Sequence, residues 1–277
     1  MRLEGKTALI TGGSRGIGKA IAKKFVEEGA KIVVSDILKD ELEKTVAELN
    51  ALKSGAAAAS VSDVTNFEDV QRSVAETVKF GGKIDILVNN AGIDPGGSIV
   101  DIPIAQWKKI LDVNLNGPFY HMRAAIPEMI KQGGGSIVNI ASLAAVRCLP
   151  SMPAYCSSKG GLLQLSAQCA LEYGPQKIRS NVVAPGATTT EMLVNAMRSL
   201  TEALKKQGVD KTGFDVMTES VPLRRPAAPE EMTGAVAFLA SDEASFINGA
   251  FLLVDGGAAL VDVSGASVAK AGVGWGV

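Results

Sequence analysis

Histidine and cysteine are scarce in this chain. The 277 residues include one histidine, His121, which excludes a His relay or a histidine-rich metal site. The three cysteines, Cys148, Cys156 and Cys169, are odd in number and form no Cys-x-x-Cys pair. This pattern indicates neither a disulfide framework nor a zinc site. We therefore expect no metal, and a reducing, cytoplasmic environment.

An excess of charge of one sign is also absent, as are long apolar runs. The chain has 28 Lys and Arg against 29 Asp and Glu, scattered along its length, for a formal net charge of −1. Without a basic stripe, a nucleic-acid partner is not expected. No apolar run reaches the roughly 18 residues of a membrane-spanning helix, and residues 1–6 carry no signal-peptide pattern. We therefore expect a small-molecule partner and no membrane.

Short β-rich runs alternate with longer stretches of helical pattern. Most of the runs are continuously hydrophobic, as in parallel strands that are covered on both faces. Between the first two runs, Ile17, Ile21 and Phe25 repeat at helical spacing. The sequence predicts an α/β fold, with a single Rossmann-like, doubly wound parallel sheet of about seven strands flanked by helices. The expected strands are Thr7–Thr11, Lys31–Ser35, Ala57–Val61 (weak by propensity), Ile84–Asn89, Ser136–Ile140, Ser180–Ala184 and Ala250–Val254.

The composition shows no internal domain boundary, so we expect one domain over residues 1–257. Residues 190–225 are polar, contain methionines and lack a strand, which is typical of a lid. The tail, residues 258–277, is rich in Gly, Ala and Val, and we expect it at a subunit interface.

A glycine-rich loop follows the first strand and opens the first helix. Its spacing is Gly-x-x-x-Gly-x-Gly, which differs from the usual Gly-x-Gly-x-x-Gly fingerprint of dinucleotide-binding folds. Glycines let the chain turn tightly, and the helix N-terminus adds partial positive charge, so a pyrophosphate is expected here. The expected contacts in this loop are Gly12, Ser14, Arg15, Gly16, Ile17 and Gly18.

Asp36 follows the second strand, 18 residues after Gly18. A carboxylate at this position accepts hydrogen bonds from the adenosine ribose hydroxyls and repels a 2′-phosphate, which favours NAD over NADP. No arginine follows directly, at Ile37 or Leu38. Arg15 keeps NADP open as an alternative, because its side chain is long enough to reach toward a phosphate.

Tyr155 and Lys159 stand four residues apart and therefore share one helix face. A tyrosine with a pKa of ~10 must approach neutrality to exchange a proton with an alcohol, and a shift of roughly 3 units requires about 4 kcal/mol. A neighbouring ammonium, together with a positively charged nicotinamide, is able to supply that preference. Ser142 follows the fifth strand at the carboxyl edge of the sheet, where open α/β sheets bind ligands.

These motifs together resemble the classical short-chain dehydrogenase/reductase family, of the NAD-dependent alcohol dehydrogenase type. The resemblance runs in order from residue 3 to Gly257 and rests on the glycine loop, Asn89-Asn90-Ala91-Gly92, Ser142, Tyr155-x-x-x-Lys159 and Pro185-Gly186. It implies hydride transfer between NAD(H) and a secondary alcohol or ketone. It also implies a catalytic tetrad of Asn114, Ser142, Tyr155 and Lys159, in which Asn114 holds a water that links the lysine to solvent.

The resemblance implies further contacts and a quaternary structure. The cofactor contacts that it adds are Asp63, Val64, Asn90, Ala91, Gly92, Tyr155, Lys159, Pro185, Gly186, Thr188 and Thr190. It implies a homotetramer that pairs the long helices following the fourth and fifth strands, and the second of these presents Leu162, Leu165, Ser166 and Cys169 to the partner. Ser180 departs from the valine that is usual in the family, and we expect this to affect packing alone.

The expected substrate lining is mostly apolar with adaptable methionines. It predicts a small or medium, hydrophobic or alicyclic alcohol, with Asp94 and Arg147 available for polar groups. The lining residues are Ile93, Asp94, Pro95, residues 143–150, Met152, Met192 and Met197.

Three other readings of the sequence stay open. An NADPH-dependent 3-oxoacyl thioester reductase shares the tetrad, although Asp36 argues against its cofactor. A non-catalytic NAD-binding sensor has no need of all four tetrad residues. A lyase or epimerase with internally used NAD usually carries a larger C-terminal domain than this chain has room for.

Overall fold

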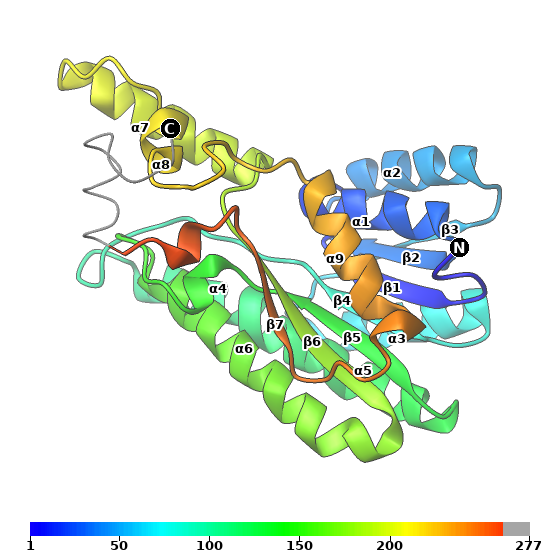
Figure 1. Ribbon diagram of the computed structural model, residues 1–277. Coiled ribbons are helices and arrows are strands. Elements are labelled where there is room, and N and C mark those ends of the chain that lie inside the picture. Colours follow the sequence, from blue (N-terminus) through cyan, green and yellow to red (C-terminus); the bar gives the residue numbers. More distant parts are fainter. Residues whose placement is uncertain (263–277) are drawn as a thin grey trace.

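Seven strands form one parallel sheet in the computed structural model, which describes residues 1–262 (Figure 1). Their order across the sheet is β3-β2-β1-β4-β5-β6-β7. The strands are β1 (Thr7–Thr11), β2 (Lys31–Asp36), β3 (Ala57–Val61), β4 (Ile86–Asn89), β5 (Gly135–Ile140), β6 (Ile178–Pro185) and β7 (Phe251–Val254). The predicted fold class is confirmed, and all seven strands lie within two residues of their expected bounds.

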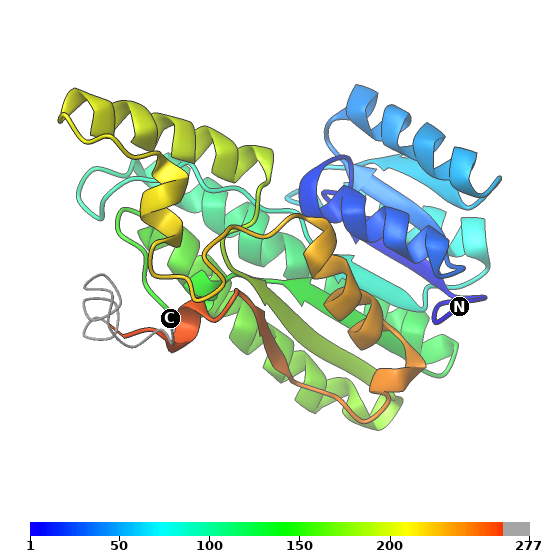
Figure 2. The ribbon, with the colours of Figure 1, turned by 45° about the horizontal axis from the view of Figure 1, so that its top comes forward.

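Helices connect the strands and cover both faces of the sheet (Figures 1 and 2). They are α1 (Gly16–Glu27), α2 (Lys39–Leu52), α3 (Phe67–Gly81), α4 (Ile104–Leu111), α5 (Gly117–Lys131), α6 (Pro153–Tyr173), α7 (Glu191–Lys206), α8 (Gly213–Thr218) and α9 (Glu230–Ala240). Short single turns are η1 (Asp112–Asn116), η2 (Leu143–Ala145), η3 (Gly174–Gln176), η4 (Asp242–Ala244) and η5 (Ala258–Leu260).

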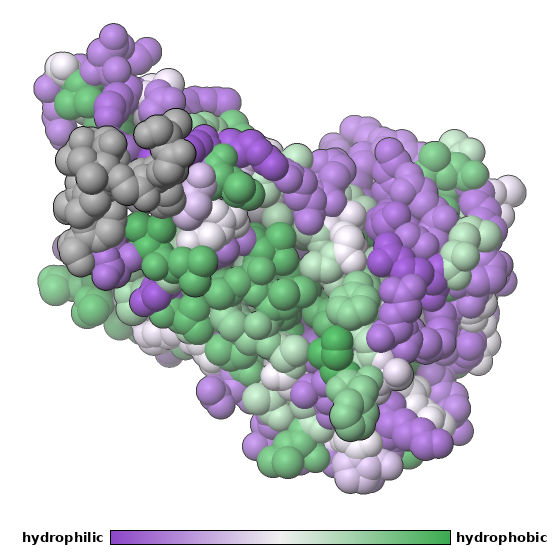
Figure 3. Space-filling model, in the orientation of Figure 1, coloured by the Kyte–Doolittle hydropathy of each residue, from purple (hydrophilic) through white to green (hydrophobic). Residues whose placement is uncertain are grey.

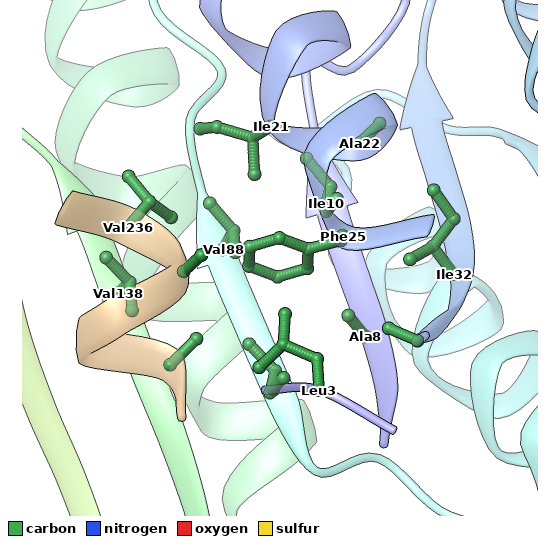
Figure 4. Packing of buried hydrophobic residues seen from close by; sticks show 14 of the residues in the cluster. Leu3, Ala8, Ile10, Ile21, Ala22, Phe25, Ile32, Val88, Val138 and Val236 are labelled. Atoms are coloured by element: carbon green, nitrogen blue, oxygen red, sulfur yellow. The ribbon is translucent and has the colours of Figure 1, made fainter. Parts of the chain in front are cut away.

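Alternation along the strands divides the core into two layers. On β1, Ile10 packs with α1 and α9 on one face, whereas Leu9 packs with α3, α5 and α6 on the other. Figure 4 shows the first layer, in which Phe25 of α1 lies among Ile10, Ile21 and Val236. Because both of their faces are buried, the central strands β1 and β4 are mostly apolar, as the sequence predicted. The edge strands β3 and β7 are partly exposed.

The order of the strands reverses between β1 and β4. At such a switch point the loops after neighbouring strands run to opposite faces and leave a crevice at the carboxyl edge of the sheet. The loop after β1 and the segment after β4 therefore meet there. Helices α7 and α8 project from the end of β6, away from the two layers (Figure 2). They occupy the stretch that the sequence predicted to be a strandless lid.

Candidate active site

The loop between β1 and α1 contains glycines in conformations that other residues avoid. The φ angles of Gly12 and Gly16 are +61° and +54°, in the left-handed region that favours glycine. A Cβ on Gly12 would lie 2.7 Å from the Cα of Ala91, and one on Gly18 would lie 2.3 Å from the Gly12 carbonyl oxygen. The loop therefore folds closely onto itself and onto the end of β4, with space for backbone alone.

The N-terminus of α1 has no side-chain cap. Its N-cap residue, Arg15, forms no side-chain capping hydrogen bond and pairs instead with Glu191, with Nη1 2.5 Å from Oε2. The hydroxyl of Ser14 also turns away and donates to Asp36 Oδ2 at 2.5 Å. An uncapped helix N-terminus behind a tight glycine turn attracts a pyrophosphate. These residues therefore fit a dinucleotide cofactor, which would lie along Gly16–Gly18.

Asp36 is the last residue of β2, and its carboxylate is held by protein groups on both oxygens. Oδ2 also accepts from the backbone N–H of Ser14 at 3.2 Å, and Oδ1 accepts from that of Leu38 at 3.1 Å. The side chain is thereby fixed beside the glycine loop. The sequence predicted a carboxylate beside this loop, after the second strand.

Asn90 ties the end of β4 to β1. Its Nδ2 donates to the carbonyls of Thr11 and of the next residue, at 3.0 and 2.9 Å. The backbone N–H groups of Asn90 and Ala91 both donate to Thr11 Oγ1, at 3.0 and 3.1 Å. Gly92 comes next, and a Cβ there would lie 3.5 Å from Lys159 Nζ. The Asn90 side chain therefore joins β4 to β1, and Gly92, two residues later, lies beside Lys159.

Two of the cofactor contacts that the resemblance implies, Asp63 and Val64, lie after β3. Asp63 is exposed, and its Oδ1 accepts from the backbone and the hydroxyl of Thr65 at 2.9 and 2.8 Å. Asn66 is the N-cap of α3. Val64 is buried, and a Cβ on Gly117 would lie 3.0 Å from its Cγ2. Both residues follow the carboxyl end of a strand, on the same edge as the glycine loop.

The segment after β6 lies against the glycine loop. Pro185 ends the strand, and a Cβ on Gly186 would lie 2.8 Å from the Cα of the residue at position 255. Thr188 is buried and donates its hydroxyl to the Gly186 carbonyl at 3.1 Å. Thr190 is the N-cap of α7, and its Cγ2 lies 3.5 Å from the Cβ position of Gly16. The cofactor contacts predicted after β6 thus stand opposite the predicted pyrophosphate contacts.

Tyr155, Lys159 and Ser142 meet at the carboxyl end of β5. The Tyr155 hydroxyl is hydrogen-bonded to the Ser142 side chain. Lys159 is buried, and its Nζ donates to the Ile140 carbonyl at 2.9 Å. The same Nζ lies 5.7 Å from the centroid of the Tyr155 ring. The structure therefore brings together the serine, the phenol and the amine that the sequence predicted to act together.

Asn114 lies in a π-helical turn, η1, between α4 and α5. Its Oδ1 accepts from the Ile93 N–H at 2.9 Å, and its Nδ2 donates to the Ile93 carbonyl at 2.9 Å and to Ser158 Oγ at 3.1 Å. Ser158 Oγ in turn donates to the Tyr155 carbonyl at 2.7 Å. Asn114 therefore holds the loop after β4 against α6. The sequence did not reveal the π-turn or the part played by Ser158, although Ser158 stands inside the Tyr-x-x-x-Lys motif.

Burial changes the pKa of both central groups. It raises the pKa of Tyr155 to about 12, in spite of the hydrogen bond from Ser142. It lowers the pKa of Lys159 to about 8. Both shifts disfavour the charged form, as expected for groups removed from water. The residues around Tyr155 therefore raise its pKa, because desolvation outweighs the hydrogen bond from Ser142, whereas the sequence predicted that Lys159 and a nicotinamide together lower it.

Other expected substrate contacts point elsewhere. Arg147 donates from Nη2 to the Ala259 carbonyl at 2.6 Å, so it holds η5. Met197 is buried beneath α8, where a Cβ on Gly213 would lie 2.5 Å from its carbonyl oxygen. Met192 is exposed at the start of α7. The methionines are therefore divided between packing within the lid and its surface.

The predicted partner-facing side of α6 is wrong for Leu162 and Ser166, whereas Leu165 and Cys169 line a groove between α3, α5 and α6. Leu162 packs within the subunit against Ala141 of β5 and Val182 of β6. Ser166 Oγ lies 2.9 Å from Ser180 Oγ. Leu162 and Ser166 therefore face the sheet and not a partner. Ser180 is more than a packing substitution, since it belongs to a buried hydrogen-bond network.

The described residues contain neither a cluster of metal ligands nor a membrane-spanning helix. No group of three or more His, Cys, Asp or Glu side chains within residues 1–262 is arranged to hold a metal ion. In the same part of the chain, no helix is both long and apolar enough to cross a bilayer.

Comparisons with known proteins agree on one group of enzymes. A family described as enoyl-(acyl carrier protein) reductase matches residues 12–259. A 3-oxoacyl acyl-carrier-protein reductase of Thermotoga maritima is 37% identical and covers 93% of this chain and 99% of its own. The trans-4-hydroxycyclohexanecarboxylate dehydrogenase of Sinomonas cyclohexanicum is 38% identical, with 92% and 93% covered. The crystal structure of levodione reductase has a TM-score of 0.88 at 32% identity and covers 94% of this chain and 100% of its own.

Proposed function

This chain belongs to the short-chain dehydrogenase/reductase family of oxidoreductases, and from that premise we propose that it interconverts a secondary alcohol and its ketone with NAD(H). One observation carries the proposal. The hydrogen-bonded Tyr155–Ser142 pair and the Lys159 amine stand at the same sheet edge as a glycine cradle that fits a dinucleotide. We propose the predicted tetrad and cofactor contacts as the functional residues.

Each tetrad residue has a distinct part in the proposed reaction. Tyr155 takes the hydroxyl proton of the alcohol, and Ser142 holds the substrate oxygen by a hydrogen bond. An NAD⁺ held along Gly16–Gly18 would supply the hydride acceptor and, before the transfer, a positive charge near the phenol. Lys159, with a pKa of about 8, is mostly an ammonium at neutral pH and favours the phenolate by its charge. Asn114 positions the loop beside them and, in the predicted role, holds the water that exchanges protons with the lysine.

Cofactor choice rests on the surroundings of the adenosine ribose. The fixed Asp36 carboxylate accepts from ribose hydroxyls and repels a 2′-phosphate. Arg15, the candidate phosphate ligand, is paired with Glu191. Both features support NAD over NADP.

A substrate panel tests the function. Purified protein is incubated with NAD⁺ or NADP⁺ and cyclic and linear secondary alcohols, and reduced nicotinamide is followed by absorbance. We expect turnover of several alcohols, a higher kcat/KM with NAD⁺, and less than a tenth of wild-type turnover in Tyr155→Phe. Tyr173→Phe, at the far end of α6, is the matched control. A kcat/KM ratio of NADPH over NADH above one would overturn the NAD assignment.

A 3-oxoacyl thioester reductase is the second candidate, supported by the 37% identical relative and by the description of the matching family. Reduction of a 3-oxoacyl thioester with NADPH, and no alcohol oxidation with NAD⁺, would favour it. The sensor reading predicts NADH binding without turnover of any alcohol. The lyase or epimerase reading predicts cofactor that stays bound through purification.

We further propose a cytoplasmic homotetramer with residues 190–225 as a lid. Two surfaces support the assembly. A groove of about 1070 Å³ runs between α3, α5 and α6, with exposed Phe119 and Ile130 on α5. Apolar residues also gather on the face of Figure 3 that carries the edge strand β7, where Leu252 and Phe246 are exposed. The tail interface predicted for residues 258–277 falls mostly outside the described residues.

A further inference from the structure

The loop after β4 carries a carboxylate, Asp94, that the proposed mechanism does not use. The preceding residue, Ile93, has both its N–H and its carbonyl bound by the Asn114 side chain at 2.9 Å. Gly92, two residues before Asp94, borders Lys159. The position of Asp94 is thus set by the same contacts that build the tetrad.

Hydrogen bonds also fix the chain on the far side of Asp94. Its own Oδ1 accepts from the Gly96 N–H at 3.1 Å. The Gly96 carbonyl accepts from Gln106 Nε2 at 2.6 Å, and the Gly97 N–H donates to the Ser151 carbonyl at 2.8 Å. The last bond joins this loop to the loop that leads into α6. The carboxylate is therefore held in a defined place and not on a free loop.

One carboxylate oxygen of Asp94, Oδ2, has no partner within residues 1–262. Asp94 is half-buried, and in the same part of the chain it forms no ion pair. Four groups act on the Tyr155 phenol from the elements around it: Lys159 and Cys156 of α6, Ser142 after β5, and Asp94. The negative charge of Asp94 raises the pKa of Tyr155 further, and so opposes the proton transfer that the proposed reaction needs. A half-buried acceptor in this place is useful if the substrate supplies its donor.

We propose that Asp94 accepts a hydrogen bond from a second hydroxyl of the substrate, so that the preferred substrate is a neutral diol, with that hydroxyl close to the reacting carbinol. This inference rests on the proposed function and narrows its substrate class. A plain alcohol leaves the acceptor unpaired, and an acid places a second negative charge beside it. A diol satisfies Oδ2 and reduces the effect of its charge on Tyr155.

Three alicyclic probes test the inference: cyclohexane-1,2-diol, cyclohexanol and 2-hydroxycyclohexanecarboxylate. We expect the wild type to prefer the diol over cyclohexanol by at least tenfold in kcat/KM. Asp94→Ala brings this ratio close to one. Asp94→Asn keeps the hydrogen bond from the Gly96 N–H to Oδ1. We expect this variant to have a higher kcat/KM for 2-hydroxycyclohexanecarboxylate. Its pH–rate profile for cyclohexanol should rise at a lower pH than that of the wild type, because the charge that raises the pKa of Tyr155 is gone. Asp101→Asn, the same charge change on an exposed residue of the same segment, is the matched control.

A binding measurement separates this inference from the proposed function. Trp107 and Ile93 pack against the same small cluster, which includes Ile102 and Ala154, so Trp107 fluorescence reports on the loop, and Trp107→Phe identifies its signal. If the diol binds more tightly than cyclohexanol and Asp94→Ala removes this difference, the inference is supported even when no alcohol is oxidised. In that case the absence of turnover overturns the proposed function alone. Equal binding of the two probes, or an unchanged preference in a folded Asp94→Ala protein, overturns the inference and leaves the proposed function standing.

Discussion

Because the chain has a single histidine, the effect of a buried imidazole on the pH dependence of stability can be measured separately from other groups. His121 of α5 is fully buried, and its Nδ1 lies 2.9 Å from the Gly117 carbonyl. Because a carbonyl only accepts, Nδ1 carries the proton and Nε2 is the free lone pair. Nε2 is buried without a hydrogen-bond partner in the described structure. Protonation of Nε2 would place a charge in the core, and burial therefore lowers the pKa of His121 from 6.5 to about 4.

The sign of the effect follows from proton binding. Between pH 6.5 and about 4, the unfolded chain is protonated at this residue and the folded chain is not. Stability is therefore lost as the pH falls through this window. The lowering of the His121 pKa from 6.5 to about 4 removes about 3.4 kcal/mol from the free energy of unfolding once the residue is protonated in both states. Between pH 7 and pH 5, the loss of stability from this residue is about 2 kcal/mol.

Urea unfolding at fixed protein concentration measures this difference. The free energy of unfolding of the wild type is compared at pH 7 and pH 5 with that of His121→Asn, whose amide replaces the donor to the Gly117 carbonyl. We expect the variant to be less stable at pH 7 but to lose about 2 kcal/mol less than the wild type on acidification. Carboxylates such as Glu28, with a pKa of about 2, contribute equally to both proteins. Equal losses in the two proteins would refute a buried, neutral His121.

Three further predictions concern the cofactor cradle and the core. Gly18→Ala places a Cβ 2.3 Å from a backbone oxygen. We expect the affinity for NADH, measured by nicotinamide fluorescence, to fall at least tenfold. An unchanged affinity would refute the argument that the loop has space for backbone alone. Glu191→Gln frees Arg15, so kcat/KM with NADP⁺ should rise severalfold, and Arg15→Gln in the same background should reverse the gain. Ser180→Val leaves buried groups unpaired and adds volume, and we expect a loss of about 2 kcal/mol in urea unfolding, whereas a neutral result would mean that the network adds nothing.

Much of the fold and of the site was predictable because the signals are local. A continuous apolar run, such as Ile86–Val88 in β4, is enough to indicate a strand buried on both faces. The glycine spacing and the four-residue separation of Tyr155 and Lys159 each describe a few consecutive residues. Their order along the chain then indicated the family.

The sequence by itself determined the α/β class, the strands, the family and the residue types of the site. Tertiary structure alone decided which groups meet: Lys159 with the Ile140 carbonyl, Arg15 with Glu191, and the inner face of α6 with the sheet. It also decided the direction of the tyrosine pKa, since desolvation depends on everything packed around the phenol. Periodicity records that a residue is buried, whereas partners and local dielectric arise when segments distant in sequence come together.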